Sequence, residues 1–148
     1  MAVRSARPDD LDEICALIRE LAEYEKLEDE VELDPAEVNV HLFGDRPVAS
    51  VLIAEQEGEV AGFALYFPSF STFLGRPGIW LEDLFVRPAF RGQGHGRAMI
   101  DTLRARTAGR LEWDVLDWNE SAISFYESLG ASPVRGWTRY RWLKEGGR

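Results

Sequence analysis

Cysteine is nearly absent from the chain, which has Cys15 alone among its 148 residues. One cysteine cannot form an internal disulfide, and no cluster of histidine and cysteine has the spacing of a structural zinc site. No apolar run approaches the roughly 20 residues of a membrane-spanning helix, and the first residues show no signal-type apolar stretch. We therefore expect a soluble, cytoplasmic protein that holds no metal.

Basic residues are also scarce, because 17 Lys and Arg stand against 26 Asp and Glu, for a formal net charge of −9. Such an excess of negative charge repels phosphate backbones and anionic lipid surfaces, so nucleic acid and membranes are poor partner hypotheses. The negative charge is equally consistent with a small cationic partner and with a role in solubility alone. The length and the 45% hydrophobic content indicate one globular domain over residues 1–148.

Helix and strand patterns alternate along this domain without repeats or low-complexity tracts. The strands expected from apolar and β-branched runs are residues 3–6, 50–55, 59–67, 79–86, 111–116 and 138–143. The helices expected from apolar periodicity are residues 8–22, 35–42, 98–108 and 119–129. Cys15 falls on the apolar stripe of the first helix, which favours a small buried side chain over a nucleophile. The class is α/β, a mixed sheet covered by helices.

A glycine-rich stretch, residues 91–97, joins the strand at 79–86 to the following helix. Such a loop lets the backbone approach a ligand, and the helix N-terminus attracts a phosphate. The dinucleotide pattern GxGxxG fails, because Gly96 comes one place early and Arg97 stands where the third glycine belongs. The P-loop pattern fails because no Lys followed by Ser or Thr comes after Gly96.

The stretch around Arg91, Gly94 and Gly96 resembles the Arg/Gln-x-x-Gly-x-Gly/Ala motif of the GCN5-related N-acetyltransferases (GNAT). The resemblance implies the GNAT fold, a mixed and mostly antiparallel sheet flanked by helices, and acetyl-CoA as co-substrate. The cofactor-binding residues that it implies are Leu84, Phe85, Val86, Arg91, Gly92, Gln93, Gly94, His95, Gly96, Arg97 and Asn119.

Three further blocks, residues 18–25, 80–86 and 118–126, are similar to the spermidine/spermine (diamine) acetyltransferases and the related thialysine-acetylating branch. The similarity implies an N-acetyltransferase that acts on a primary amine of a small cationic acceptor, such as a polyamine, a diamine or thialysine. Members of this family are commonly homodimers, and Trp137 and Trp142 could supply apolar contact there or simply pack in a core. Phe73 departs from the pattern, since polyamine-acetylating members often have tryptophan there.

Transfer of an acetyl group to an amine needs a neutral nucleophile, help for the carbonyl oxygen and a proton for the leaving thiolate. The resemblance gives Tyr126 the role of proton donor, and it implies that Glu82 binds the amine and accepts its proton through a water. Asp83 would support it by hydrogen bonding, since neighbouring strand residues face opposite ways and only one of the pair can face the substrate. Tyr24 and Glu25 match a pair that contacts the polyamine.

Two further features have less defined roles. His95 lies inside the glycine loop, but we expect its side chain to point outward while its backbone serves the ligand, so a general-base role is disfavoured. The acidic run from Glu23 to Glu32 is either a solvated face or a surface that attracts a polyamine. Two other functions stay open: a GNAT enzyme for another amine (an amino acid, an antibiotic or a protein N-terminus), and a non-catalytic CoA-sensing module.

Overall fold

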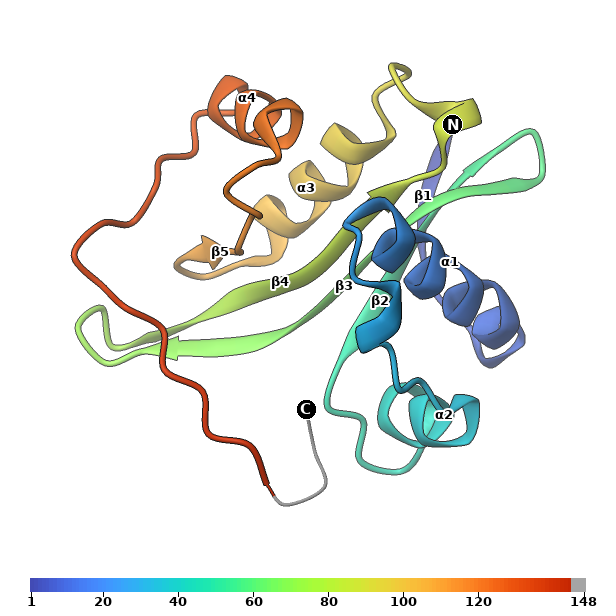
Figure 1. Ribbon diagram of the computed structural model, residues 1–148, viewed down its shortest axis with the longest axis horizontal. Coiled ribbons are helices and arrows are strands. Elements are labelled where there is room, and N and C mark those ends of the chain that lie inside the picture. The colour runs from blue at the N-terminus through green and yellow to red at the C-terminus, as the bar shows by residue number, and fades with distance from the viewer. Residues whose placement is uncertain (145–148) are drawn as a thin grey trace. The chain divides into compact units, whose positions relative to one another are not determined.

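The computed structural model describes residues 1–144 and divides into two compact units, Met1–Asp114 and Val115–Arg148. Within the described chain, the first unit holds one sheet of five strands in the order β1-β2-β3-β4-β5 (Figure 1). The strands are β1 Ala2–Ser5, β2 Ser50–Gln56, β3 Glu59–Ser71, β4 Arg76–Val86 and β5 Leu111–Glu112. Neighbouring strands are antiparallel except for β4 and β5, which are parallel. The predicted mixed and mostly antiparallel sheet is confirmed.

Two hairpins connect the central strands. Glu57 and Gly58, between β2 and β3, have φ values of 52° and 80°, the pair of positive angles that a type I′ turn requires. β3 and β4 extend beyond the strands expected at residues 59–67 and 79–86 and form a hairpin, since their pairing continues to Ser71 and Arg76. Phe70 therefore lies in a strand, where the sequence pattern indicated a loop.

The helices of the first unit are α1 Leu11–Tyr24, α2 Pro35–Phe43 and α3 His95–Arg106, with short 3-10 turns η1 Pro8–Asp10, η2 Glu28–Glu30 and η3 Pro88–Phe90. The core beside α1 consists of Ile14, Leu17, Leu21, Val51, Ile53, Phe63 and Phe85. Leu52 and Ala54 alternate with Val51 and Ile53 and are also buried, so both faces of the sheet are covered. α3 lies across the strands opposite α1 (Figure 1) and buries Met99, Ile100 and Leu103.

Cys15 is buried on α1, as its place on the apolar stripe predicted. Burial raises the pKa of its thiol. A buried thiol with a raised pKa is a poor nucleophile, so the structure gives Cys15 a packing role.

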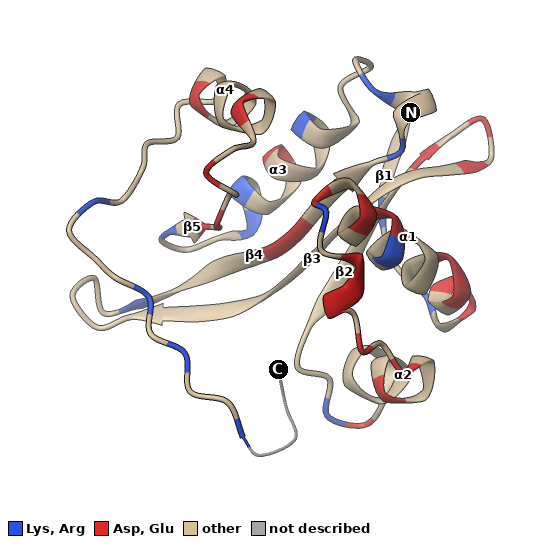
Figure 2. Cartoon of the chain, in the orientation of Figure 1, with Lys and Arg blue, Asp and Glu red and all other residues tan. Residues whose placement is uncertain are grey.

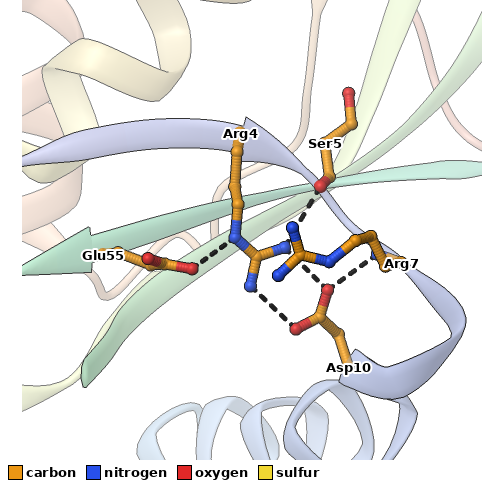
Figure 3. Close-up of polar contacts among 5 residues, drawn as sticks. All are labelled: Arg4, Ser5, Arg7, Asp10 and Glu55. Carbon is orange, nitrogen blue, oxygen red and sulfur yellow. Dashed lines mark hydrogen bonds and ion pairs between the residues drawn. The ribbon is translucent and has the colours of Figure 1, made fainter. Parts of the chain in front are cut away.

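Arg4 links β1 to the start of α1 and to β2 (Figure 3). Its guanidinium donates to both carboxylate oxygens of Asp10 at 2.8 Å and also pairs with Glu55. Asp10 in turn accepts from the backbone N–H of Arg7 at 2.7 Å. The hydrogen bonds from Arg4 lower the pKa of this buried carboxyl. The cluster fixes the direction in which the chain leaves the edge strand and enters α1.

Arg87, just beyond β4, fastens α1 to the other end of the sheet. It donates to Glu20 at 2.9 and 3.0 Å, to Glu13 at 2.7 Å and to the backbone oxygen of Val60 at 3.1 Å. The hydrogen bonds to Glu20 are the main cause of its raised pKa. This multidentate contact holds the point where β4 leads into the glycine loop.

The second unit contains α4 Glu120–Ser128. Asn119 caps this helix, since its Oδ1 accepts from the N–H of Ala122 at 3.2 Å. Gly130, at a φ of 91°, ends the helix, and the backbone oxygen of Tyr126 accepts from Ala131 at 3.2 Å.

Several other elements also differ from the sequence expectations. The strand expected at residues 111–116 is only Leu111–Glu112, and α3 begins three residues earlier than predicted. The strand expected at residues 138–143 is wrong, because the structure has none there. The alternating pattern is present, but a strand forms only where a neighbouring strand bonds its backbone. Tyr140 and Trp142 are instead 91% and 85% exposed.

Candidate active site

The glycine loop has an open geometry. Gly92 and Gly94 have φ values of 76° and 87°, a region that side chains disfavour. A Cβ on Gly92 would meet no atom within 4 Å, and one on Gly94 would meet only the methyl carbon of Met1, at 4.0 Å. The loop glycines are therefore demanded by backbone conformation, and they leave open space beside the backbone.

The helix N-terminus opens directly from this loop. The first turn of α3 follows Gly94, whose backbone oxygen accepts from Ala98 at 3.0 Å. The N–H groups of such a first turn have no partner within the helix, and they carry the positive end of its dipole. Loop and helix thus form the geometry that binds an anionic phosphate group.

Arg91 opens the loop and lies against the end of β4. Its Nε donates to the backbone oxygen of Val86 at 2.9 Å. Its guanidinium carbon is 4.9 Å from the ring centroid of Tyr24 and 5.5 Å from that of Phe85. Arg91 therefore connects the glycine loop to the C-terminal end of α1. Arg97 is a more exposed cation, with its Nε 3.9 Å from Asp101.

The outer edge of β4 becomes free near the loop. β5 pairs only with Ile79 and Trp80, through Leu111 and Glu112. Beyond Trp80, among residues 1–144, β4 has a strand neighbour on the β3 side alone. The segment with Leu84, Phe85 and Val86 thus presents one unpaired edge beside the glycine loop.

Three carboxyl groups lie together at this end of β4. Burial is the main cause that raises the pKa of Asp83, to about 7, and the charges of Glu82 and Glu25 raise it further. Burial also raises the pKa of Glu25, with a further contribution from Glu82. Glu82 is exposed and accepts a hydrogen bond from Trp80 Nε1 at 3.0 Å. The group can attract a cation and take up a proton near neutral pH.

The pairing of β3 with β4 is irregular at this point. Leu65 pairs with Asp83 but Tyr66 pairs with Leu81, which leaves Glu82 as the extra residue of a β-bulge. Strict alternation was the basis for expecting only one of Glu82 and Asp83 to face the substrate. Strict alternation does not hold at this bulge. The charge of Glu82 raises the pKa of both Asp83 and Glu25, so Glu82 and Asp83 belong to the same electrostatic cluster.

The acidic run lies at the end of α1 and in η2, where Figure 2 shows acidic residues gathered. Glu25 is the C-cap residue of α1 and joins the β4 carboxyls. Glu23 and Glu28 instead line a surface cavity together with Arg19 and Val31.

His95 differs from its sequence expectation. Its side chain does not point outward: it is 1% exposed, and its Nε2 lies 2.7 Å from Oε1 of Gln56. The residue is the first of α3, so its side chain turns under the loop and into the packed interior. Sequence reasoning missed Gln56, because nothing at the end of the strand expected at residues 50–55 indicates a contact with the glycine loop.

The predicted site residues fall into two groups. The first unit brings together the ends of α1 and β4 and the glycine loop, with Tyr24, Glu25, Glu82, Asp83, Leu84, Phe85, Val86 and the residues from Arg91 to Arg97. The second unit holds Asn119 and Tyr126 on α4. The half-buried Tyr126 ring lies 5.5 Å from that of Phe125, at an angle of 54°.

Residues 1–144 contain neither a cluster of metal-ligating side chains nor a helix suited to a membrane. No group of three or more His, Cys, Asp or Glu side chains there could hold a metal ion. No helix of the same residues is both long and apolar enough to cross a membrane.

The chain matches known proteins over most of its length. The model of the acetyltransferase (GNAT) family matches residues 11–131. A thialysine N-epsilon-acetyltransferase of Bos taurus is 39% identical over 158 aligned residues, which cover 97% of this chain and 92% of the relative. A protein of the same name from Caenorhabditis elegans is 33% identical, with coverages of 90% and 86%.

A solved structure supports the same fold. An integron cassette protein from the mobile metagenome of V. cholerae is 27% identical, with a TM-score of 0.79 and coverage of 98% of this chain and 93% of that one. Together with the family match and the open glycine loop, these relatives identify the chain as a member of the acetyltransferase (GNAT) family, and as an acyltransferase.

Proposed function

We propose that the protein transfers the acetyl group of acetyl-CoA to a primary amine of a small cationic acceptor, such as a polyamine, a diamine or a thialysine-like compound. The observation that carries the acceptor class is the group of three carboxyls, Glu25, Glu82 and Asp83, beside the glycine loop. The names of the bovine and nematode relatives favour an acceptor of the thialysine type.

The donor side of the proposal uses the loop and the free edge of β4. Acetyl-CoA supplies the acetyl group as a thioester. Backbone N–H groups from Gln93 to Arg97 hold the pyrophosphate, with Arg97 as a nearby cation. The unpaired edge along Leu84, Phe85 and Val86 receives the pantetheine arm, whose amides match strand hydrogen bonding. The open space at Gly92 and Gly94 supports this assignment.

On the acceptor side, Glu82 binds the ammonium group and Glu25 and Tyr24 contact the rest of the molecule. In this proposal Asp83 is the proton acceptor, in place of Glu82, to which the family resemblance gave that role. Its pKa of about 7 lets it hold or release a proton near neutral pH, as a general base requires. A bound cation lowers the pKa of Asp83, so this carboxyl becomes ionised as the acceptor arrives. Tyr126 donates a proton to the leaving thiolate, and Asn119 caps the helix that carries it.

The two units act as one N-acetyltransferase domain in this proposal, since the family match at residues 11–131 includes parts of both. We also propose a cytoplasmic homodimer. The single, buried cysteine suits a reducing compartment. Trp137, Tyr140 and Trp142, each at least 80% exposed, offer an apolar surface for a second copy. Light scattering coupled to gel filtration tests the dimer, and a monomeric mass would contradict it.

The test of the function is release of free thiol from acetyl-CoA in the presence of spermidine, spermine, putrescine, thialysine, lysine and an N-terminal peptide. We expect turnover with one or more of the small di- or polycationic amines and little with the peptide. Turnover with the peptide alone would support another GNAT acceptor class. Acetyl-CoA binding without turnover on any amine would support a CoA-sensing module.

A further inference from the structure

We infer that His95 is a positioning residue for the donor loop, and that it acts through its hydrogen bond to Gln56. The inference rests on the proposed use of this loop for the pyrophosphate of acetyl-CoA. His95 touches neither reacting group in this account. It fixes the backbone on which the N–H groups of the α3 N-terminus are carried.

The tautomer of His95 follows from its partner. Nε2 lies 2.7 Å from Oε1 of Gln56, and a carbonyl oxygen only accepts, so Nε2–H donates. The other ring nitrogen, Nδ1, then carries no proton in the neutral ring. Nδ1 is buried and has no hydrogen-bond partner among the described residues. The ring is further enclosed by Phe90, whose ring meets it edge-on at 6.2 Å between centroids.

A buried histidine with one unbonded ring nitrogen is less favourable for packing than an apolar side chain would be. An imidazole with one unsatisfied nitrogen pays a desolvation penalty that a leucine or isoleucine of similar size would avoid. The neighbouring buried positions of α3, Met99, Ile100 and Leu103, are apolar. Packing alone therefore does not account for a histidine at this position, whereas a directional bond does.

The bond joins two parts of the chain that need a fixed relation. Gln56 is the last residue of β2, and His95 is the first residue of α3 after Gly94. Gly92 and Gly94 give the loop backbone wide conformational freedom. Arg91 holds the loop at its start through the backbone oxygen of Val86, and His95 holds it at its end through Gln56. Both ends of the flexible glycine segment are thus attached to the sheet.

A preorganised loop binds an anion more tightly, because its N–H groups need no ordering on binding. Removal of either partner should therefore weaken the binding of CoA and raise the KM for acetyl-CoA. It should leave kcat at saturating acetyl-CoA close to that of the wild type, since no reacting group is changed. A loss of general stability would not produce that separation of KM from kcat.

The experiment compares His95→Leu, Gln56→Leu and the double variant by calorimetric titration with CoA and by steady-state kinetics. We expect each single variant to raise the dissociation constant for CoA about tenfold, as the loss of one buried hydrogen bond predicts. The double variant should lose no more than either single one, because both remove the same bond. Ile100→Val is the control, since it trims the buried face of α3 away from the loop and should leave CoA binding unchanged.

The outcomes separate this inference from the proposed function. Wild-type protein that binds no CoA would overturn both. Wild-type protein that binds CoA, together with single variants whose dissociation constants stay within twofold of it, would overturn the positioning role alone. Additive losses in the double variant would also overturn it. If His95→Leu does not fold, Gln56→Leu gives the answer, because Gln56 is only half-buried.

Discussion

The guanidinium carbon of Arg91 lies 4.9 Å from the ring centroid of Tyr24, so the first residue of the glycine loop rests on the last residue of α1. Glu25, next to Tyr24, is one of the three carboxyls that cluster around Asp83. The donor loop and the proposed acceptor site are therefore joined through one stacked pair. A substitution at Tyr24 should therefore lower kcat/KM for both acetyl-CoA and the amine.

Replacing Tyr24 with leucine tests this connection. The variant loses a cation–π contact worth about 0.5–2 kcal/mol, so we expect kcat/KM to fall several-fold with respect to both acetyl-CoA and the amine. Tyr24→Phe keeps the ring and its contact with Arg91, so its kcat/KM for acetyl-CoA should stay close to the wild-type value. Steady-state kinetics with each substrate varied in turn measures both. A fall for the amine alone would mean that the stacking does not position the loop.

Gly94→Ala tests the open space beside the loop. The φ of 87° at Gly94 costs a non-glycine residue about 1 kcal/mol of stability, and the added methyl group enters the space proposed for the pyrophosphate. We expect CoA affinity to fall at least tenfold, measured by titration calorimetry. Gly75→Ala is the matched control, because Gly75 has a φ of 66° and a Cβ there meets nothing within 4 Å. Equal CoA affinity in the two variants would contradict the assignment.

Asp83→Asn tests the raised pKa of this carboxyl, which is about 7 against an ordinary value of 3.8. Because the folded state holds the proton more tightly, the contribution to stability is full below about pH 4 and is lost as pH rises through 7. The asparagine variant should therefore be more stable than wild type at pH 8, by about 1–3 kcal/mol, and similar at pH 4.

Urea unfolding at the two pH values measures this difference. The same variant should lose activity, because the proposed proton acceptor is gone, and its kcat/KM should lack a rise with pH near 7. A stability difference between variant and wild type that is the same at both pH values would contradict the burial of a protonated carboxyl. A variant that keeps the wild-type pH profile would remove Asp83 from proton transfer.

Tyr126→Phe removes the proposed proton donor and keeps the ring that lies against Phe125. We expect kcat to fall at least tenfold with little change in CoA affinity, since general acid catalysis contributes typically 10²–10⁴-fold. Single-turnover kinetics and CoA titration on the same preparation measure the two quantities. Unchanged turnover would assign Tyr126 to packing.

Local sequence patterns were sufficient for most of the fold. The positive φ values at Glu57 and Gly58, the glycine loop and the apolar stripe with Cys15 all depend on neighbours within one element. Whether residues 138–143 form a strand could not be predicted from their own sequence, because a strand needs a partner strand elsewhere in the chain. Its pattern was correct for a strand, and the pairing is absent.

The errors at the site have the same origin. His95 was expected to point outward because the motif describes only backbone roles, whereas its side chain is placed by Gln56, 39 residues earlier. The bulge at Glu82 depends on the register between β3 and β4, which the sequence of β4 alone does not contain. The cluster of three carboxyls around Asp83 therefore depends on the register between β3 and β4 and on where α1 ends, and neither can be predicted from one segment of sequence.

We propose that the carboxyls at the end of β4 recognise an acceptor with a second positive charge. The most direct test compares kcat/KM for the best amine of the panel with that for an analogue of equal length whose remote amino group is replaced by methyl. Wild type should prefer the dication at least tenfold, and Glu25→Gln should reduce that preference at low ionic strength, since Glu25 is the carboxyl proposed to contact the remote part of the amine. Equal kcat/KM for the two amines in the wild type would contradict the account.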